Sequence, residues 1–223
     1  MHRLKKTIYI SALFLTIAAC KKEDLNDPVI SLLGNSTVDL FMGDTYAEQG
    51  ATATDDEDGD VTANIEISGT VNSAQAGIYY ITYSVTDKAG NEAETTRAVN
   101  IHNHAFLLEG IYLVSDTIVS TIPANNDTLN YTLEVFSSSQ TDNRIFLQNI
   151  HNFGTAVSVY ADVSGTSLTI QPQSPTGMIQ PGQILSISGI CTSTAVTRIN
   201  YTVDYLFNGA GVDDTCSAVL VKQ

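Results

Sequence analysis

The chain has 223 residues, of which 43% are hydrophobic and 15% are charged, an ordinary globular composition. This composition excludes a disordered chain, a collagen, a coiled coil and a polytopic membrane protein. Asp and Glu number 24 against 10 Lys and Arg. The acidic balance argues against a nucleic-acid partner, because neutralising phosphates requires a basic face. Three cysteines are too few for a disulfide-rich scaffold.

Residues 1–19 have the pattern of a secretory signal. Arg3, Lys5 and Lys6 form a short positive region, and the residues from 7 to 19 are mostly apolar and carry no charge. A helix over that apolar part spans about 20 Å, which is shorter than the ~30 Å hydrocarbon layer of a bilayer. The segment therefore predicts a cleaved signal peptide rather than a stable transmembrane helix.

The end of this segment resembles a lipidation signal. Ile17, Ala18, Ala19 and Cys20 match the bacterial lipobox, an aliphatic residue and two small ones before a cysteine. The resemblance implies that the Cys20 thiol receives a diacylglycerol and that Cys20 becomes the first residue of the mature chain. Two or more acyl chains hold a protein at a membrane far better than one. The alternative is a plain signal peptide followed by an incidental cysteine.

Residues 20–27 are expected to form the lipidated tether. Glu23 and Asp24, just after the cysteine, resemble the export signal of Bacteroidetes-type surface lipoproteins, and an ordinary acidic linker is the alternative. The expected location is the outer membrane, lipid-anchored and exposed at the cell surface. Loss of residues 1–19 removes three basic groups, which changes the formal charge from −14 to −17. An acidic body is repelled by an anionic surface, which favours a domain that stands away from it.

Residues 28–102 show the two-residue alternation of sheets with one buried face. A turn is expected at residues 87–91, where Gly90 and Asn91 suit positive φ. The alternation predicts a β-sandwich. The residues expected on buried faces are Ile65, Ile67, Val71, Tyr79, Ile81, Tyr83, Val85, Val99 and Ile101.

The same segment resembles the bacterial surface immunoglobulin-like domain, a family of unknown function. Two motifs carry the resemblance: D-G-D-V-T at residues 58–62 and G-x-Y-x-x-x-Y-x-V-x-D-x-x-G-N at residues 77–91. The resemblance implies an immunoglobulin-like sandwich that serves as a stalk or spacer and has no activity of its own. It also places Tyr79 at the tyrosine corner of that fold and Ile81 at the position of the missing sheet-bridging cysteine.

Residues 103–223 are predicted to be all-β as well. Eight strand-like runs in this segment suit an eight-stranded antiparallel β-barrel or a second sandwich. The opening residues 106–112 weakly resemble the start of calycin-like barrels, with Tyr112 where that family usually has Trp. The runs begin near Gly110, Asn130, Arg144, Ala156, Ser167, Ile184, Thr197 and Thr215.

The loop at residues 55–60 has five carboxylates in six residues. Its carboxylates repel one another, and a calcium ion with oxygen ligands would relieve the repulsion. An EF-hand is excluded, because counting from Asp56 places Ile67 where a bidentate Glu is required. A solvated turn is the simpler interpretation. The candidate calcium ligands are Asp55, Asp56, Asp58, Asp60, Asp87 and Asn91, and no other cofactor is expected.

Cys191 and Cys216 invite a disulfide, because an exported protein meets oxidising conditions. A simple meander pairs Ile187 with Asn200 and places Cys216 beside Asp204. The two cysteines are then about eight residues, roughly 25 Å, apart along the strands. A disulfide requires Cα atoms within ~7 Å. The meander therefore disfavours the bond, which stays an open question at this stage.

The histidines suggest no complete metal site. His102 and His104 share one face of an extended segment, with Glu109 as the nearest third ligand, and interdomain linker residues are the simpler interpretation. His151 stands alone in the sequence, and His2 is lost with the signal peptide.

No nucleophile elbow, zinc-protease, C-x-x-C or P-loop motif is present, so an enzyme is not expected. The predicted function is a non-catalytic binding or adhesion module whose ligand is a polysaccharide or a protein. The alternative is a structural or accessory subunit of an outer-membrane complex. Tyr80 and Tyr160 are expected on exposed strand faces, where they could hold a sugar. The polar loops at residues 124–130 and 136–143 are further candidates.

Overall fold

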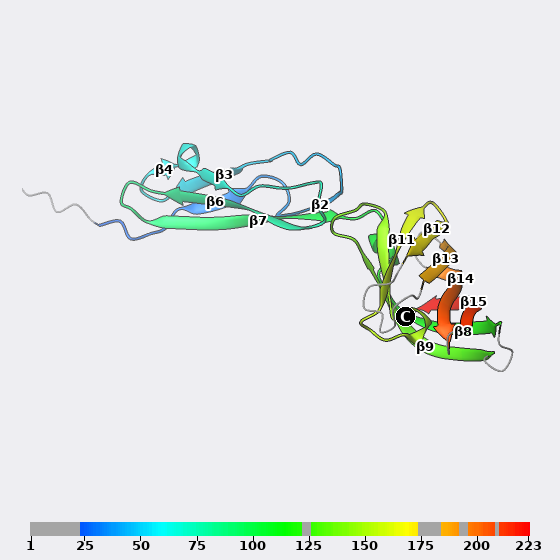
Figure 1. The fold of residues 1–223 in the computed structure, drawn as a ribbon. Coiled ribbons are helices and arrows are strands. Elements are labelled where there is room, and N and C mark those ends of the chain that lie inside the picture. Colours follow the sequence, from blue (N-terminus) through cyan, green and yellow to red (C-terminus); the bar gives the residue numbers. More distant parts are fainter. Residues whose placement is uncertain (1–22, 122–125, 174–183, 192–195, 208–209) are drawn as a thin grey trace, which may run out of the picture.

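The computed structural model describes the backbone of residues 23–121, 126–173, 184–191, 196–207 and 210–223 (Figure 1). Side chains at 172, 184–191, 201–207 and 210–213 are outside this description. In the described part, strands dominate, and the helical elements are short 3-10 turns: η1 (Thr62–Asn64), η2 (Phe106–Leu108) and η4 (Ile150–Asn152). Among these described residues, no helix has the length and apolar character needed to cross a bilayer.

The first part of the chain forms two facing sheets, as expected for an immunoglobulin-like sandwich. One sheet has the order β1-β3-β4 and the other β2-β7-β6-β5, and β2 pairs with β7 in parallel. The prediction of an all-β immunoglobulin-like domain is confirmed. The strands are β1 (Val29–Leu32), β2 (Thr37–Phe41), β3 (Ala51–Asp55), β4 (Gly59–Asp60), β5 (Glu66–Ser68), β6 (Gly77–Thr86) and β7 (Glu92–His102).

The core of the sandwich follows the predicted alternation in β6 and β7. Ile81, Tyr83 and Val85 are buried, whereas Ile78 and Tyr80, which belong to the opposite face of β6, are exposed. The prediction was wrong for Ile67, whose side chain is 51% exposed. Its strand, β5, is three residues long and lies at the edge of the four-stranded sheet, and all three of its residues are exposed, so the facing three-stranded sheet does not cover it.

The tyrosine corner lies where the resemblance placed it. The Tyr79 hydroxyl donates a hydrogen bond of 2.9 Å to the backbone carbonyl of Gln75, four residues upstream. Ile81 is buried between the sheets, where other immunoglobulin domains have a cysteine. An apolar contact therefore holds the sheets together at this position.

A fully buried cation, Arg97 on β7, ties the start of the domain to its core. Its guanidinium donates to Glu48 Oε1 at 2.9 Å and lies 5.5 Å from the centre of the Tyr83 ring. The Tyr83 hydroxyl donates to the same carboxylate oxygen. The other acceptors of the guanidinium are the backbone carbonyls of Leu33 at 2.5 Å, Asn35 at 3.0 Å and Gly50 at 3.2 Å.

The second part of the chain is a closed antiparallel barrel of eight strands in the order β10-β11-β12-β13-β14-β15-β8-β9 (Figure 1). Of the two predicted alternatives, the barrel is confirmed and the second sandwich is wrong. Closure removes every sheet edge. The strands are β8 (Gly110–Ser120), β9 (Asp127–Ser137), β10 (Arg144–Gln148), β11 (Ser158–Ser164), β12 (Ser167–Gln173), β13 (Ile184–Cys191), β14 (Val196–Phe207) and β15 (Ala210–Lys222).

The register of β13, β14 and β15 corrects the predicted meander. Ile187 pairs with Tyr201 rather than Asn200, and Cys216 also pairs with Tyr201 rather than with Asp204. Cys216 therefore lies level with Ile187, four residues from Cys191 along β13 and across an intervening strand. The rise alone is about 13 Å, beyond the reach of a disulfide. Cys216 is accordingly a buried thiol.

The two parts of the chain are joined end to end, at the end of β7 (Figure 1). The ring of Phe41 stacks on His104 with the centroids 4.8 Å apart. The backbone N–H of Ala76 in the sandwich donates to the carbonyl of Ser139 in the barrel at 3.0 Å. These contacts come from segments on both sides of the linker, so the junction is packed rather than open.

Candidate functional site

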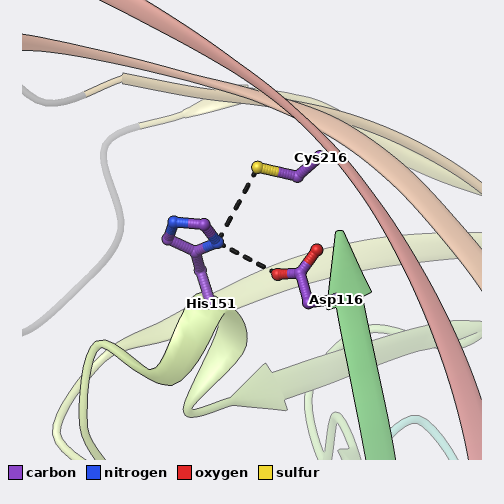
Figure 2. Close-up of side chains that lie close together, drawn as sticks. All are labelled: Asp116, His151 and Cys216. Atoms are coloured by element: carbon purple, nitrogen blue, oxygen red, sulfur yellow. Dashed lines mark hydrogen bonds and ion pairs between the residues drawn. The ribbon is translucent and has the colours of Figure 1, made fainter. Parts of the chain in front are cut away.

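Three side chains of different chemistry meet inside the barrel (Figure 2). We name Asp116, His151 and Cys216 the interior cluster. Asp116 lies on β8, where every second side chain points into the barrel, and it is fully buried. Cys216 lies on the neighbouring β15 and is 1% exposed. His151 belongs to η4 and is 9% exposed.

An unusual backbone segment brings His151 into the barrel. Asn149, His151 and Asn152 have φ values of 68°, 55° and 55°, in the left-handed region that side chains other than Gly rarely adopt. Tertiary hydrogen bonds hold this conformation. The His151 N–H donates to the Tyr131 hydroxyl at 2.9 Å, and Asn149 Nδ2 donates to the Thr132 carbonyl at 2.7 Å.

The donor atoms of the interior cluster converge on one ring nitrogen. His151 Nδ1 lies 3.0 Å from Asp116 Oδ2 and 3.7 Å from Cys216 Sγ. One such atom from each residue lies within 4.8 Å of the others. A nucleophilic triad requires the acid and the nucleophile on opposite ring nitrogens. The cluster therefore does not have that geometry, and it instead presents nitrogen, oxygen and sulfur atoms to one common point.

The sequence interpretation missed this cluster. It treated His151 as isolated, which the structure corrects, and considered Cys216 only as a disulfide partner. One signal was available: Asp116 falls on the inward face of β8, between the apolar residues Val114 and Ile118. A carboxylate on such a face needs a partner.

The structure separates the members of the predicted calcium site. Asp56 accepts a hydrogen bond from the Asn26 side chain at 2.9 Å, and Asp58 forms an ion pair of 2.8 Å with Lys88. Asp60 accepts from the backbone N–H of Thr62, which belongs to its own turn. These three carboxylates therefore point to different partners rather than to one ion.

Asp55 and Asp87 do lie together, with a third carboxylate that the sequence interpretation did not include. One oxygen each of Asp24, Asp55 and Asp87 lies within 4.8 Å of the others, and we name these residues the tether cluster. Asp55 is 8% exposed, and within the described part of the chain its Oδ2 has no hydrogen-bond partner. Asn91 links two members of this cluster, because its Nδ2 donates to Asp87 Oδ2 at 2.7 Å and to the Asp24 carbonyl at 3.3 Å.

The pKa of Asp87 is below its ordinary value. Burial raises the pKa, but hydrogen bonds from the Asn91 side chain and from the backbone N–H groups of Asn91 and Gly90 lower it by a larger amount. These bonds stabilise the turn between β6 and β7. Asp87 is therefore held as a carboxylate by its own turn.

His102 and His104 each have a separate carboxylate partner at the junction. His102 Nε2 lies 3.0 Å from Asp39, and His104 Nδ1 lies 2.8 Å from Asp142. Glu109 instead accepts a hydrogen bond from the Ser137 backbone at 2.9 Å. The three residues do not converge, and the histidines belong to the packed junction.

The outer face of the barrel carries a row of aromatic rings across β9, β10 and β11. Phe146 pairs with Phe136 on one side and with Tyr160 on the other, and we name these three residues the aromatic row. Phe136 and Phe146 are stacked with their centroids 5.2 Å apart, and Phe136 is 38% exposed. Tyr160 is half-buried rather than exposed, because the Arg144 guanidinium lies 4.1 Å from its ring centre.

The other sugar-binding candidates have different surroundings. Tyr80 is 58% exposed on the sandwich. The loop at 136–143 is held at the junction, where Asn103 Nδ2 donates to the carbonyls of Ser138 and Thr141, both at 2.8 Å. Residues 124 and 125 of the other loop are outside the described residues.

Comparison with known proteins identifies the sandwich. Residues 30–101 match the family model described as "Bacterial surface protein, Ig-like domain", which confirms the resemblance over this part of the chain. The comparison with curated proteins found no match.

Two solved structures illustrate the distant likenesses. The lipoprotein BT2262 from Bacteroides thetaiotaomicron is 19% identical with a TM-score of 0.35, covering 88% of this chain and 100% of that one. The CBM51-2 and INT domains of Clostridium perfringens ZmpB, solved with GlcNAc, are 16% identical with a TM-score of 0.29. That match covers 87% of this chain but only 44% of the other.

Proposed function

We propose that this chain is a non-catalytic binding module of a bacterial cell surface, in which the sandwich is a spacer and the barrel carries the ligand-binding face. The family description of residues 30–101 supports the surface location. The lipobox-like sequence before Cys20 supports a lipid anchor in the outer membrane.

The shape of the sandwich supports the role of a spacer. The Asp24 carbonyl is bonded to Asn91, immediately before β7, and the barrel follows directly after β7 ends at His102. The eleven residues of β7 rise about 3.3 Å each, so the strand spans roughly 35 Å. The tether and the barrel therefore lie at opposite ends of the domain, and the barrel is held away from the anchor.

The aromatic row is the observation that carries the proposed ligand-binding face. The faces of sugar rings are apolar and stack on aromatic side chains, whereas their hydroxyls form hydrogen bonds with charged and amide groups. Such groups flank the row on both sides. Arg144 and Asp162 form a two-bonded pair at 2.7 and 3.0 Å, and Gln148 pairs in register with Glu134. A polysaccharide is the ligand class that fits this combination best.

Glycan-array screening tests this proposal, using soluble protein that begins at Lys21. We expect binding to a polysaccharide, and we expect Phe146→Ala to weaken it at least tenfold, because the change removes the middle ring of the row. Tyr80→Ala is the matched control: it removes an exposed aromatic side chain from the sandwich and leaves binding unchanged. The absence of any glycan signal, or equal binding by the Phe146→Ala protein, would contradict the proposal.

The lipid anchor has its own test. Cys20→Ala removes the acceptor thiol, so we expect the protein to remain unprocessed and to lose its acyl chains. Metabolic labelling with a fatty acid and fractionation after a high-salt wash measure both effects. A variant that is still trimmed and still sediments with membranes would show that Cys20 is not the anchor.

A second candidate function is that of an accessory subunit of an outer-membrane complex, and an apolar strip on the barrel favours it. Leu113 on β8 pairs with Val221 on β15, and the two residues are 50% and 58% exposed. The exposed residues Ile111 and Val219 extend this strip along the same strands. Contiguous exposed apolar surface is typical of protein contacts. If the partner is a protein, Leu113→Asp reduces its co-purification from solubilised envelopes and leaves glycan binding intact.

A further inference from the structure

We propose that the interior cluster is a binding site for a zinc-like divalent transition-metal ion, held by Asp116, His151 and Cys216. The proposed sugar-binding face lies on the outside of the barrel, whereas this site lies inside it (Figure 2). The metal-site proposal and the sugar-binding proposal are therefore independent, and failure of one does not affect the other.

The spacing of the donor atoms fits a metal site. Zinc binds nitrogen and oxygen at about 2.0–2.1 Å and sulfur at about 2.3 Å, so the ligand atoms of a tetrahedral site lie roughly 3.3–3.6 Å apart. His151 Nδ1 lies 3.0 Å from Asp116 Oδ2 and 3.7 Å from Cys216 Sγ. These two distances depart from the ideal values by a few tenths of an ångström, and the Asp116 oxygen and the Cys216 sulfur lie within 4.8 Å of each other. Small side-chain shifts would therefore complete the site.

The donor types select the metal. Thiolate, imidazole and carboxylate form a borderline-soft set that suits zinc or cobalt, whereas calcium and magnesium prefer oxygen ligands alone. On binding, the ion replaces the proton between His151 and Asp116, and the thiol of Cys216 releases its proton to water. A water molecule can supply the fourth ligand, because His151 is the most exposed member of the cluster.

The fold holds the ligands in place before an ion arrives. Asp116 and Cys216 lie on strands that pair directly, so the register of the barrel sets their separation. His151 is held by a segment with three positive φ values, a kind of strain that concentrates at functional sites.

The Tyr131 hydroxyl connects two of the ligands. It accepts from the His151 N–H at 2.9 Å and lies 3.4 Å from Asp116 Oδ2, to which it can donate. Groups that orient metal ligands in this way are a regular feature of protein metal sites.

Cobalt substitution is the decisive experiment, using soluble protein from Lys21 onward after treatment with a chelator. We expect one cobalt ion per chain, with visible d–d bands of a four-coordinate site and a near-ultraviolet charge-transfer band from thiolate to cobalt. Zinc should displace the cobalt and abolish both signals. Absence of these bands, with only the weak spectrum of hydrated cobalt, would overturn the proposal.

Two cysteine variants identify the ligand. Cys216→Ser should abolish the charge-transfer band, whereas Cys191→Ser, the matched control four residues away in register, should leave it unchanged. The opposite pattern would overturn the assignment. His151→Gln should weaken zinc binding at least tenfold.

A measurement on the unaltered chain covers the case in which a variant fails to fold. The X-ray absorption spectrum of the zinc-loaded protein should show one sulfur neighbour with the remaining neighbours nitrogen or oxygen. A first shell of nitrogen and oxygen alone would refute the role of Cys216. A hydrogen-bonded cluster without metal affinity would give no stoichiometric zinc binding in calorimetry.

Discussion

Replacing Arg97 with Met should destabilise the sandwich far more than its ion pair alone suggests. The Arg97 side chain is fully buried, and its guanidinium makes four hydrogen bonds, three of them to backbone carbonyls. Met has a similar length but no donor, so Arg97→Met leaves these carbonyls and the Glu48 carboxylate without this partner.

The magnitude follows from burial. Glu48 is 32% exposed, so water offsets part of the lost ion pair, whereas the Arg97 side chain is 0% exposed and its loss removes a buried charge from four partners at once. Removal of one partner from a buried charged network costs about 3–5 kcal/mol. For a domain of this size, that corresponds to a fall in melting temperature of at least roughly 12 °C.

Lys88→Met is the matched control in the same domain. It removes the cation of an ion pair of nearly equal length, but Lys88 is 81% exposed, so the expected cost is about 0–1 kcal/mol. Calorimetric unfolding of the protein that begins at Lys21 measures both variants. Equal losses of stability for the two would refute the argument from burial.

The remaining predictions concern other contacts of the sandwich. Burial raises the pKa of Glu48, but hydrogen bonds from two tyrosines and the backbone, together with Arg97, lower it below its ordinary value. Its contribution to stability is therefore present above the ordinary pKa and lost as pH falls through the lowered value, so Glu48→Gln should flatten the acid side of a melting-temperature profile between about pH 5 and pH 3. Tyr79→Phe removes the hydrogen bond to Gln75 and should cost about 1 kcal/mol in urea denaturation, whereas the same change at an exposed tyrosine costs nothing measurable. Calcium binding stays a prediction and now concerns the tether cluster: added calcium should raise the melting temperature of the sandwich, and Asp24→Asn should reduce the increase, whereas an unchanged melting temperature would reject a calcium site.

Local sequence patterns were sufficient to predict that this chain is built from strands and that its first part is an immunoglobulin-like domain. Alternation in β6 and β7 identified the buried residues, because successive side chains of a strand point to opposite faces. The paired motifs at residues 58–62 and 77–91 identified the immunoglobulin-like domain, including the tyrosine corner at Tyr79. Alternation failed at Ile67, because edge position is a property of the sheet rather than of the strand.

The sequence did not decide how distant segments meet. The calcium interpretation used only residues near two turns, and it missed Asp24 because the tether lies against those turns only in the folded domain. The choice between a barrel and a sandwich depended on whether the last strand, β15, pairs with the first, β8, to close the sheet. This pairing joins residues about a hundred positions apart, and no strand pattern contains it.

The interior cluster shows this division most clearly. From the sequence alone, Asp116 is a carboxylate on an apolar strand face and His151 is an isolated histidine. Cys216 is then considered only as a possible disulfide partner of Cys191. Barrel closure and the left-handed backbone around His151 place their donor atoms within 4.8 Å of one another. Composition and alternation act over neighbouring residues and are therefore readable along the chain, whereas a site formed by residues 35 to 100 positions apart exists only after the strands have paired.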